Sequence, residues 1–234
     1  MSRDVVIVDS VRTGLAKSFR GSFNLTRSDD MLAHCIDAIL ERNPSLDPAE
    51  VEDVIVGAAN HEGEQGGNIA RLGVILSKLP VTTAAQSINR FCSSGLQSIA
   101  IAATQIASGQ TEVAMAGGVD SISMGARQQG AKAEKNPILV EQKPEIFMAM
   151  GNTAEVVARR YQVTREAQDQ FALMSQQRYA AAAASGAIAE EIVPMAVKMK
   201  KVNKDSRGNE DYYRELWSNK EKYIGKMVTV RFQN

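Results

Sequence analysis

The sequence predicts an α/β fold in which a β-sheet is covered by helices on both faces. Short apolar runs that are typical of buried strands alternate with longer helical segments through the first 120 residues. Such alternation favours a layered α/β domain. Apolar residues also make up 44% of the 234 residues, which is enough to bury a sizeable core.

The N-terminal segment supplies the first strand and the first helix. Residues 4–9 form a short apolar run and are predicted to be a buried strand. Thr26 and Asp29 have the spacing of a capping box, in which two side chains satisfy free backbone N–H groups at the start of a helix. We therefore expect a helix to begin there and to run to about Glu41.

The next part of the chain continues the alternation. Strands are predicted at 51–58, 82–88 and 113–116, and helices at 69–77 and 93–107. The last of these helices is apolar nearly all round, so we expect it to be buried on most sides.

The pattern changes after residue 123. Residues 124–149 have no clear period, which indicates a loop or an inserted segment. A strong helix is predicted over 164–185, with Thr164 as its cap. The last thirty residues, 205–234, contain no alanine and five aromatic residues: Tyr212, Tyr213, Trp217, Tyr223 and Phe232. This break in composition indicates a fusion or reading-frame junction, or else an ordinary surface appendage.

Charge and composition exclude several functional classes. The 27 basic residues are balanced by 27 acidic ones, so there is no basic excess and we expect no nucleic-acid partner. We also expect no membrane partner, since neither a spanning segment nor a secretory signal is present. A cytoplasmic protein, or one of an organelle matrix, is expected. Two cysteines and two histidines at these spacings match no disulfide framework and no zinc pattern, so no metal site is expected.

Cys92 is the first candidate for a catalytic residue. It follows a predicted strand and directly precedes a predicted helix, where the macrodipole and unpaired backbone N–H groups stabilise a thiolate and can hold an oxyanion. Gly95 leaves space for a substrate to approach. The residues alone equally admit a buried, inert cysteine.

The remaining cysteine and the histidines are weaker candidates. Cys35 lies in the middle of an amphipathic helix, which favours a core position. His34 and His61 are the available bases for Cys92, although lone histidines are usually structural or solvated.

The segment around Cys92, INRFCSSGLQ, resembles the nucleophile motif of thiolases. Six further segments are similar to elements of that family and occur in the family's order, which makes the combined pattern specific. The resemblance covers about residues 3–204. The seven matching segments are residues 11–22, 62–71, 88–97, 116–123, 150–158, 165–172 and 191–194.

The resemblance implies a thiolase-like layered fold, with a mixed sheet, helices on both faces and an inserted loop domain. It implies acyl transfer to coenzyme A, by thiolytic cleavage of 3-ketoacyl-CoA or the reverse Claisen condensation, through a thioester on Cys92. The Cys92 N–H would contribute to an oxyanion hole, and Met150 would line the acyl pocket. Acyl-CoA and CoA are then substrates, no cofactor is expected, and a homodimer or homotetramer is implied. The form of the glycine-rich loop favours the degradative branch, linked to fatty acid β-oxidation.

The resemblance also divides the chain into an N-terminal core over 1–121, an incomplete loop domain over 122–204 and an atypical tail over 205–234. Three further catalytic groups of the family have no counterpart in this sequence: a GHP histidine, a CxG cysteine and an NEAF asparagine. We therefore expect an incomplete enzyme. The alternatives are a non-catalytic half-thiolase that associates with intact thiolase subunits, and a decarboxylating condensing enzyme, against which the EGEQG and MGxTAE elements argue.

Overall fold

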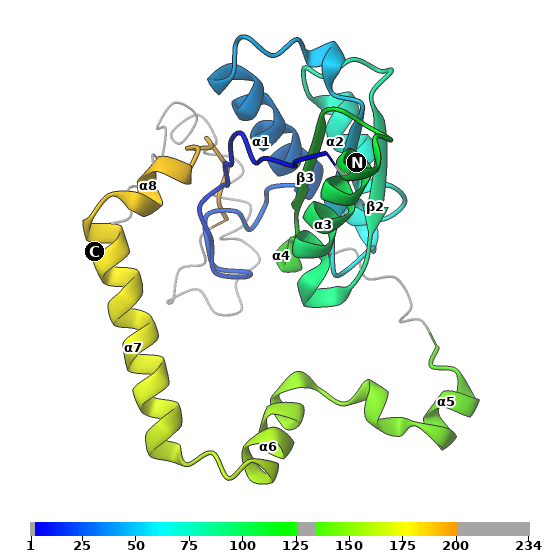
Figure 1. Cartoon of the computed structure of the whole chain (residues 1–234). Helices are drawn as coiled ribbons and strands as arrows, with labels where there is room; N and C mark the ends of the chain where they lie inside the picture. The colour runs from blue at the N-terminus through cyan, green and yellow to red at the C-terminus, as the bar shows by residue number, and fades with distance from the viewer. Residues whose placement is uncertain (1–2, 126–133, 201–234) are drawn as a thin grey trace, which may run out of the picture. The chain divides into compact units, whose positions relative to one another are not determined.

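The computed structural model of the chain describes residues 3–125 and 134–200. These residues form two compact units. The first holds residues 3–125 and 192–200 and contains a β-sheet with helices packed against it (Figure 1). The second holds residues 134–191 and is helical.

Three parallel strands form the sheet, in the order β2–β1–β3. The central strand β1 (Asp53–Gly57) pairs with β2 (Ala84–Ile88) on one side and with β3 (Ala114–Gly118) on the other. The three strands predicted between residues 51 and 118 are thereby confirmed, although β3 continues through its two glycines. All strands in the described residues are parallel.

The side chains of β1 alternate between two helical layers, because successive residues of a strand point to opposite faces. Val54 and Val56 pack into the main apolar cluster with α1 (Ser28–Arg42) and α2 (Ile69–Leu76). On the other face, the Asp53 carboxylate accepts a hydrogen bond of 3.2 Å from Gln105 of α3 (Ser94–Ser108). The predicted α/β class with helices on both faces is confirmed.

The order of the strands explains where the functional loops lie. The connection from β1 through α2 leads to one neighbour, and the connection from β2 through α3 crosses to the other side of β1. Right-handed crossovers in opposite directions place their helices on opposite faces of the sheet. Ligands of open α/β sheets bind beyond the carboxyl ends of the strands at such a reversal, so this edge is the place to look for a site.

The predicted strand at residues 4–9 is wrong. This segment belongs to no strand, and the three apolar side chains of residues 6–8 are at least 75% exposed. At its end, Asp9 pairs with Arg42 and accepts a hydrogen bond from Asn43, both at the end of α1. An apolar run forms a strand only where a neighbour pairs with its backbone groups, and no described strand lies beside this one.

The predicted capping box of α1 is also wrong. The N-cap is Arg27, whose side chain does not cap the helix. The Thr26 N–H bonds the Phe23 carbonyl instead. Asp29 accepts two hydrogen bonds from the Arg27 guanidinium, of 2.9 and 2.7 Å, because a bidentate, charge-assisted pair is stronger than a bond to a neutral N–H.

α3 occupies the predicted position and ends at Gly109, whose φ of 76° suits a glycine. The prediction that it is buried on most sides is wrong. Its buried residues are Ser94, Ser98 and Ala102, which form a single line along the helix. Leu96 is 72% exposed, because it lies on a different face of the helix from these three residues.

The second unit contains the predicted helix over 164–185, observed as α7 (Arg165–Ala184) and capped by Thr164, whose hydroxyl accepts the Ala167 N–H at 3.2 Å. The segment predicted as a loop or insertion contains helical turns. The second unit also contains α5 (Pro137–Gln142), α6 (Met150–Arg160), α8 (Ala187–Glu191) and the 3-10 turn Pro144–Phe147. The first unit contains the short helix α4 (Ile122–Gly125) and the 3-10 turns Pro48–Glu50, Gly63–Gln65 and Phe91–Ser93. The tail predicted at 205–234 lies outside the described residues, and the three domain boundaries stay predictions.

Candidate active site

Three loops meet at the carboxyl edge of the sheet, one after each strand. Side chains bond them to one another around Ala59, which follows β1. The Ala59 carbonyl accepts a hydrogen bond of 3.0 Å from Asn89, after β2, and the Ala59 N–H donates one of 2.8 Å to Asp120, after β3. The loop after β1 is therefore fixed to the loops on both sides.

Cys92 lies in the 3-10 turn between β2 and α3, and it is exposed. The structure thus places it where the sequence predicted, and the alternative of a buried cysteine is wrong, while its reactivity stays a prediction. The preceding residue, Phe91, has a φ of 49°, a left-handed conformation that is uncommon for residues other than glycine. Cys92 is an accessible thiol in the turn directly before the amino end of a 15-residue helix.

Gly57, the last residue of β1, allows α3 to approach the sheet. A Cβ atom at this position would lie 2.2 Å from the carbonyl carbon of Ser94 and 2.3 Å from its oxygen. A Cβ on Gly95 would lie 3.8 Å from Gly118, an ordinary contact, so packing on the sheet does not itself require glycine there. This packing role of Gly57 was not predicted from the sequence, although a glycine that ends a strand is a signal of close backbone approach.

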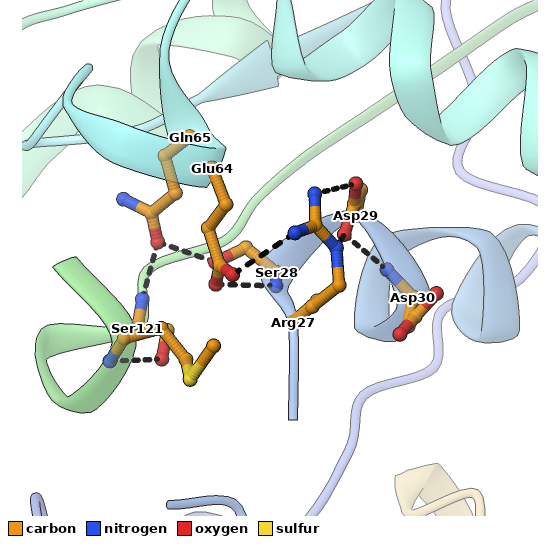
Figure 2. Close-up of polar contacts among 8 residues, drawn as sticks. Arg27, Ser28, Asp29, Asp30, Glu64, Gln65 and Ser121 are labelled. Carbon is orange, nitrogen blue, oxygen red and sulfur yellow. Dashed lines mark hydrogen bonds and ion pairs between the residues drawn. The ribbon is translucent and has the colours of Figure 1, made fainter. Parts of the chain in front are cut away.

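Glu64 provides the cap that α1 lacks (Figure 2). Its buried carboxylate accepts hydrogen bonds from the N–H of Ser28, at 3.0 Å, and from the Ser28 hydroxyl, at 3.2 Å. The Arg27 guanidinium lies 3.7 Å from the other carboxylate oxygen. A carboxylate from another loop therefore satisfies a free N–H at the start of the helix and complements its macrodipole.

Gln65 joins the loops after β1 and β3 to the start of α1. Its Oε1 accepts hydrogen bonds from the Ser28 hydroxyl, at 2.6 Å, and from the Ser121 N–H. Its Nε2 donates to the Asn60 carbonyl, at 2.7 Å, and to Asp120, at 3.0 Å. Because every hydrogen-bonding position of this buried amide is used, the side chain fixes the geometry of the edge.

Replacing Gln65 with glutamate is expected to lower the free energy of unfolding by about 2–4 kcal/mol, despite the similar shape. The new carboxylate oxygen would face two acceptors, the Asn60 carbonyl and the Asp120 carboxylate. Urea denaturation followed by circular dichroism measures the loss. The control Gln176→Glu lies on the exposed α7 and should change stability by less than about 0.5 kcal/mol. Equal stability of the two variants would contradict the prediction.

Neither histidine is hydrogen bonded to Cys92 in the described residues. The Nε2 of His61 lies 2.9 Å from the Ala58 carbonyl and 3.2 Å from the Ile88 carbonyl. Since carbonyl oxygens only accept, this nitrogen carries a proton and ties the loop after β1 to the end of β2. The Nε2 of His34 on α1 is buried and has no partner within the described part of the chain. The geometry therefore gives neither histidine the position of a base for Cys92.

Cys35 is half-buried on α1. Burial raises the pKa of the Cys35 thiol above its ordinary value, and a backbone hydrogen bond from Thr13 opposes the shift. Because the thiolate is the reactive form, both the partial burial of Cys35 and its raised pKa predict that it reacts with alkylating agents more slowly than Cys92 does.

Iodoacetamide at pH 8 is expected to alkylate Cys92 at least about tenfold faster than Cys35 in the folded protein. Peptide mass spectrometry of quenched time points measures the two rates separately. In denaturant the two rates should become similar, because burial no longer distinguishes the thiols. Equal rates in the folded protein would contradict the assignment.

Met150, the predicted acyl-pocket residue, is the first residue of α6 in the second unit and is 71% exposed. Its role stays a prediction. Within residues 3–125 and 134–200, no three His, Cys, Asp or Glu side chains form a group that could hold a metal ion. In these two ranges, no helix is both long and apolar enough to cross a membrane.

Comparisons with known proteins identify the family. Residues 5–220 match the model of the family described as thiolase, N-terminal domain. The chain is 41% identical over 211 residues to a 3-ketoacyl-CoA thiolase of Bacillus subtilis, which covers 90% of this chain. It is 41% and 40% identical to β-ketoadipyl-CoA thiolases of Pseudomonas knackmussii and Pseudomonas aeruginosa, over 86% of its length.

The matched region contains all three strands, the loops at their carboxyl ends and Cys92. The chain spans 54% of the length of these three relatives. With a family match over most of its residues, and relatives above 40% identity, the chain belongs to the thiolase family.

Proposed function

We propose that the chain transfers acyl groups to coenzyme A through a thioester on Cys92. The observation that carries the proposal is the exposed thiol of Cys92 in a turn at the amino end of α3. That turn lies at the carboxyl edge of the sheet and within the region shared with proteins named thiolases.

The chemistry follows from a thiolate at this position. In thiolysis, the Cys92 sulfur attacks the 3-keto carbon of 3-ketoacyl-CoA, and the bond between carbons 2 and 3 breaks. The electron pair of the broken bond stays on carbon 2, which takes up a proton and becomes the methyl group of acetyl-CoA. The thiol of a second CoA then attacks the carbonyl carbon of the Cys92 thioester, so that acyl-CoA is released and the Cys92 thiol is restored. The Cys92 N–H, in the turn before α3, can hold the oxyanion of the tetrahedral intermediates.

The substrate class proposed is a 3-ketoacyl thioester of CoA. One relative is named for 3-ketoacyl-CoA and two for β-ketoadipyl-CoA, and these names share a ketone two carbons from a thioester. The β-ketoadipyl names indicate a pathway other than fatty acid β-oxidation, so the class of thioester is proposed here and not the pathway. Assembly as a homodimer or homotetramer, and a cytoplasmic location, stay predictions.

The test is acyl-enzyme formation by the purified chain. The protein is incubated with acetyl-CoA or acetoacetyl-CoA, and intact mass and peptide mapping are expected to show one acetyl group on Cys92. Thiolysis is followed in parallel by the loss of acetoacetyl-CoA absorbance in the presence of free CoA. An adduct without turnover means that the chain performs the first half-reaction and that the proton-transfer groups lie elsewhere. A folded chain that forms no adduct would overturn the proposal.

A non-catalytic half-thiolase is the second candidate, favoured by the exposed apolar face of α3. Leu96 and Ile99 on this face are 72% and 42% exposed, and an apolar face of this kind is suited to contact with another subunit. Co-purification with a full-length thiolase, combined with the absence of a Cys92 adduct, would support this function over the first.

A further inference from the structure

We infer that Ser94 is a positioning residue, whose buried hydroxyl holds the backbone turn that presents Cys92. The inference rests on the proposed role of Cys92 as the nucleophile. Ser94 is the first residue of α3 and is 3% exposed. A hydroxyl at this depth is retained only where it is hydrogen bonded, and its partners show what it does.

The Ser94 hydroxyl closes a ring across the turn. Its oxygen accepts a hydrogen bond of 2.8 Å from the N–H of Arg90 and donates one of 2.6 Å to the carbonyl of Phe91. A longer contact of 3.4 Å reaches the carbonyl of Ala58, after β1. The two closer partners are backbone groups that precede Cys92, whereas Ser94 follows it. One side chain therefore fixes the entry and the exit of the turn relative to each other, with Cys92 between them.

Phe91 is the residue that needs this support. Its φ of 49° lies in the left-handed region, which residues other than glycine adopt only where surrounding contacts impose it. The Phe91 N–H donates to Asn89 Oδ1 at 2.7 Å, and its carbonyl accepts from Ser94. The Phe91 carbonyl also accepts the Ser94 N–H within the 3-10 turn. Loss of the Ser94 hydroxyl removes the side-chain support for this conformation, and the next residue, Cys92, would shift with Phe91.

Ser98 provides a matched control one helical turn further along α3. It is also fully buried, and its hydroxyl contacts the carbonyls of Gly95 and Gly117, both at 2.7 Å. The bond to Gly117 ties α3 to β3, the bond to Gly95 lies within α3, and neither includes the turn. Removal of either hydroxyl takes side-chain hydrogen bonds away from backbone groups, but only the Ser94 hydroxyl bonds Arg90 and Phe91.

The experiment compares Ser94→Ala with Ser98→Ala by the rate at which iodoacetamide alkylates Cys92, with urea denaturation in parallel. Ser94→Ala is expected to lower the rate about fivefold, because a displaced turn no longer holds the thiol in its accessible position. Ser98→Ala should lose comparable stability and keep the rate within about twofold of the wild type. A wild-type rate for Ser94→Ala, or an equal fall for Ser98→Ala, would overturn the inference.

A second variant tests whether Ser94 acts through Phe91. Because glycine adopts the left-handed conformation without steric cost, adding Phe91→Gly to Ser94→Ala is expected to recover part of the alkylation rate. No recovery would contradict the inference.

The proposed function is tested separately by the acetyl adduct. If the wild type forms no adduct, that proposal fails while the alkylation rates still decide the role of Ser94. If wild type, Ser94→Ala and Ser98→Ala acetylate at one rate, the inference fails alone.

Discussion

Replacing Cys92 with alanine is expected to abolish the acetyl adduct and to lower any thiolysis by about 10⁴-fold or more, because the covalent route is lost with its nucleophile. The effect is purely chemical. Cys92 is exposed, so the substitution should change the free energy of unfolding by less than about 0.5 kcal/mol. Intact mass spectrometry after incubation with acetyl-CoA measures the first effect, and urea denaturation measures the second.

The matched control is Cys35→Ala, which removes the other thiol. Cys35 is half-buried, and burial raises the pKa of its thiol, so this variant should keep the acetyl adduct at the wild-type rate. An adduct on the Cys92→Ala protein would place the acyl group on another residue and would contradict the assignment of the nucleophile. An adduct missing from both variants would indicate that the loss follows from disturbed folding.

The sequence predicted those elements whose local pattern and tertiary contacts agree. β1 contains the apolar run Val54–Val56 and lies at the centre of the sheet with all five residues buried. α2 begins where Asn68 can cap it, and the Asn68 side chain accepts the Arg71 N–H. Cys92 could be chosen because one position in a strand–turn–helix segment has a special electrostatic environment, which depends on order along the chain alone.

The predictions that were wrong concern elements whose state depends on a distant partner. Residues 4–9 have the composition of a strand, but no described strand pairs with them. α3 has the composition of a buried helix, but its buried residues are only Ser94, Ser98 and Ala102. Periodicity describes what a segment can bury, whereas pairing and burial depend on which surfaces the rest of the chain supplies.

The same distinction holds within the site. Glu64 and Gln65 lie in a segment that resembles a motif of the family, but their hydrogen bonds to Ser28 join residues 36 and 37 positions apart in the sequence. No local rule identifies that a carboxylate in one loop caps a helix that begins in another. Spacing predicts that Thr26 and Asp29 cap the helix, whereas Arg27 holds Asp29 in a stronger pair.

Gly57 is the position at which a single methyl group is expected to disturb most of this geometry. Gly57→Ala should lower the free energy of unfolding by about 3 kcal/mol or more, since overpacking against a rigid neighbour forces the backbone to move. The added Cβ would meet the carbonyl carbon of Ser94 at 2.2 Å. That atom belongs to the main chain, so no change of rotamer relieves the contact.

The displacement would act directly on the candidate site, because the carbonyl in question belongs to the first residue of α3 and Cys92 lies two residues before it. We therefore expect Gly57→Ala to slow Cys92 alkylation as well as to lower the urea midpoint. Gly117→Ala is the control. Gly117 pairs with Val56 beside Gly57, and a Cβ there meets nothing within 4 Å, so stability should change by less than about 1 kcal/mol. Equal behaviour of the two variants would show that α3 adjusts freely over the sheet, and close packing at Gly57 would then not be what positions the turn.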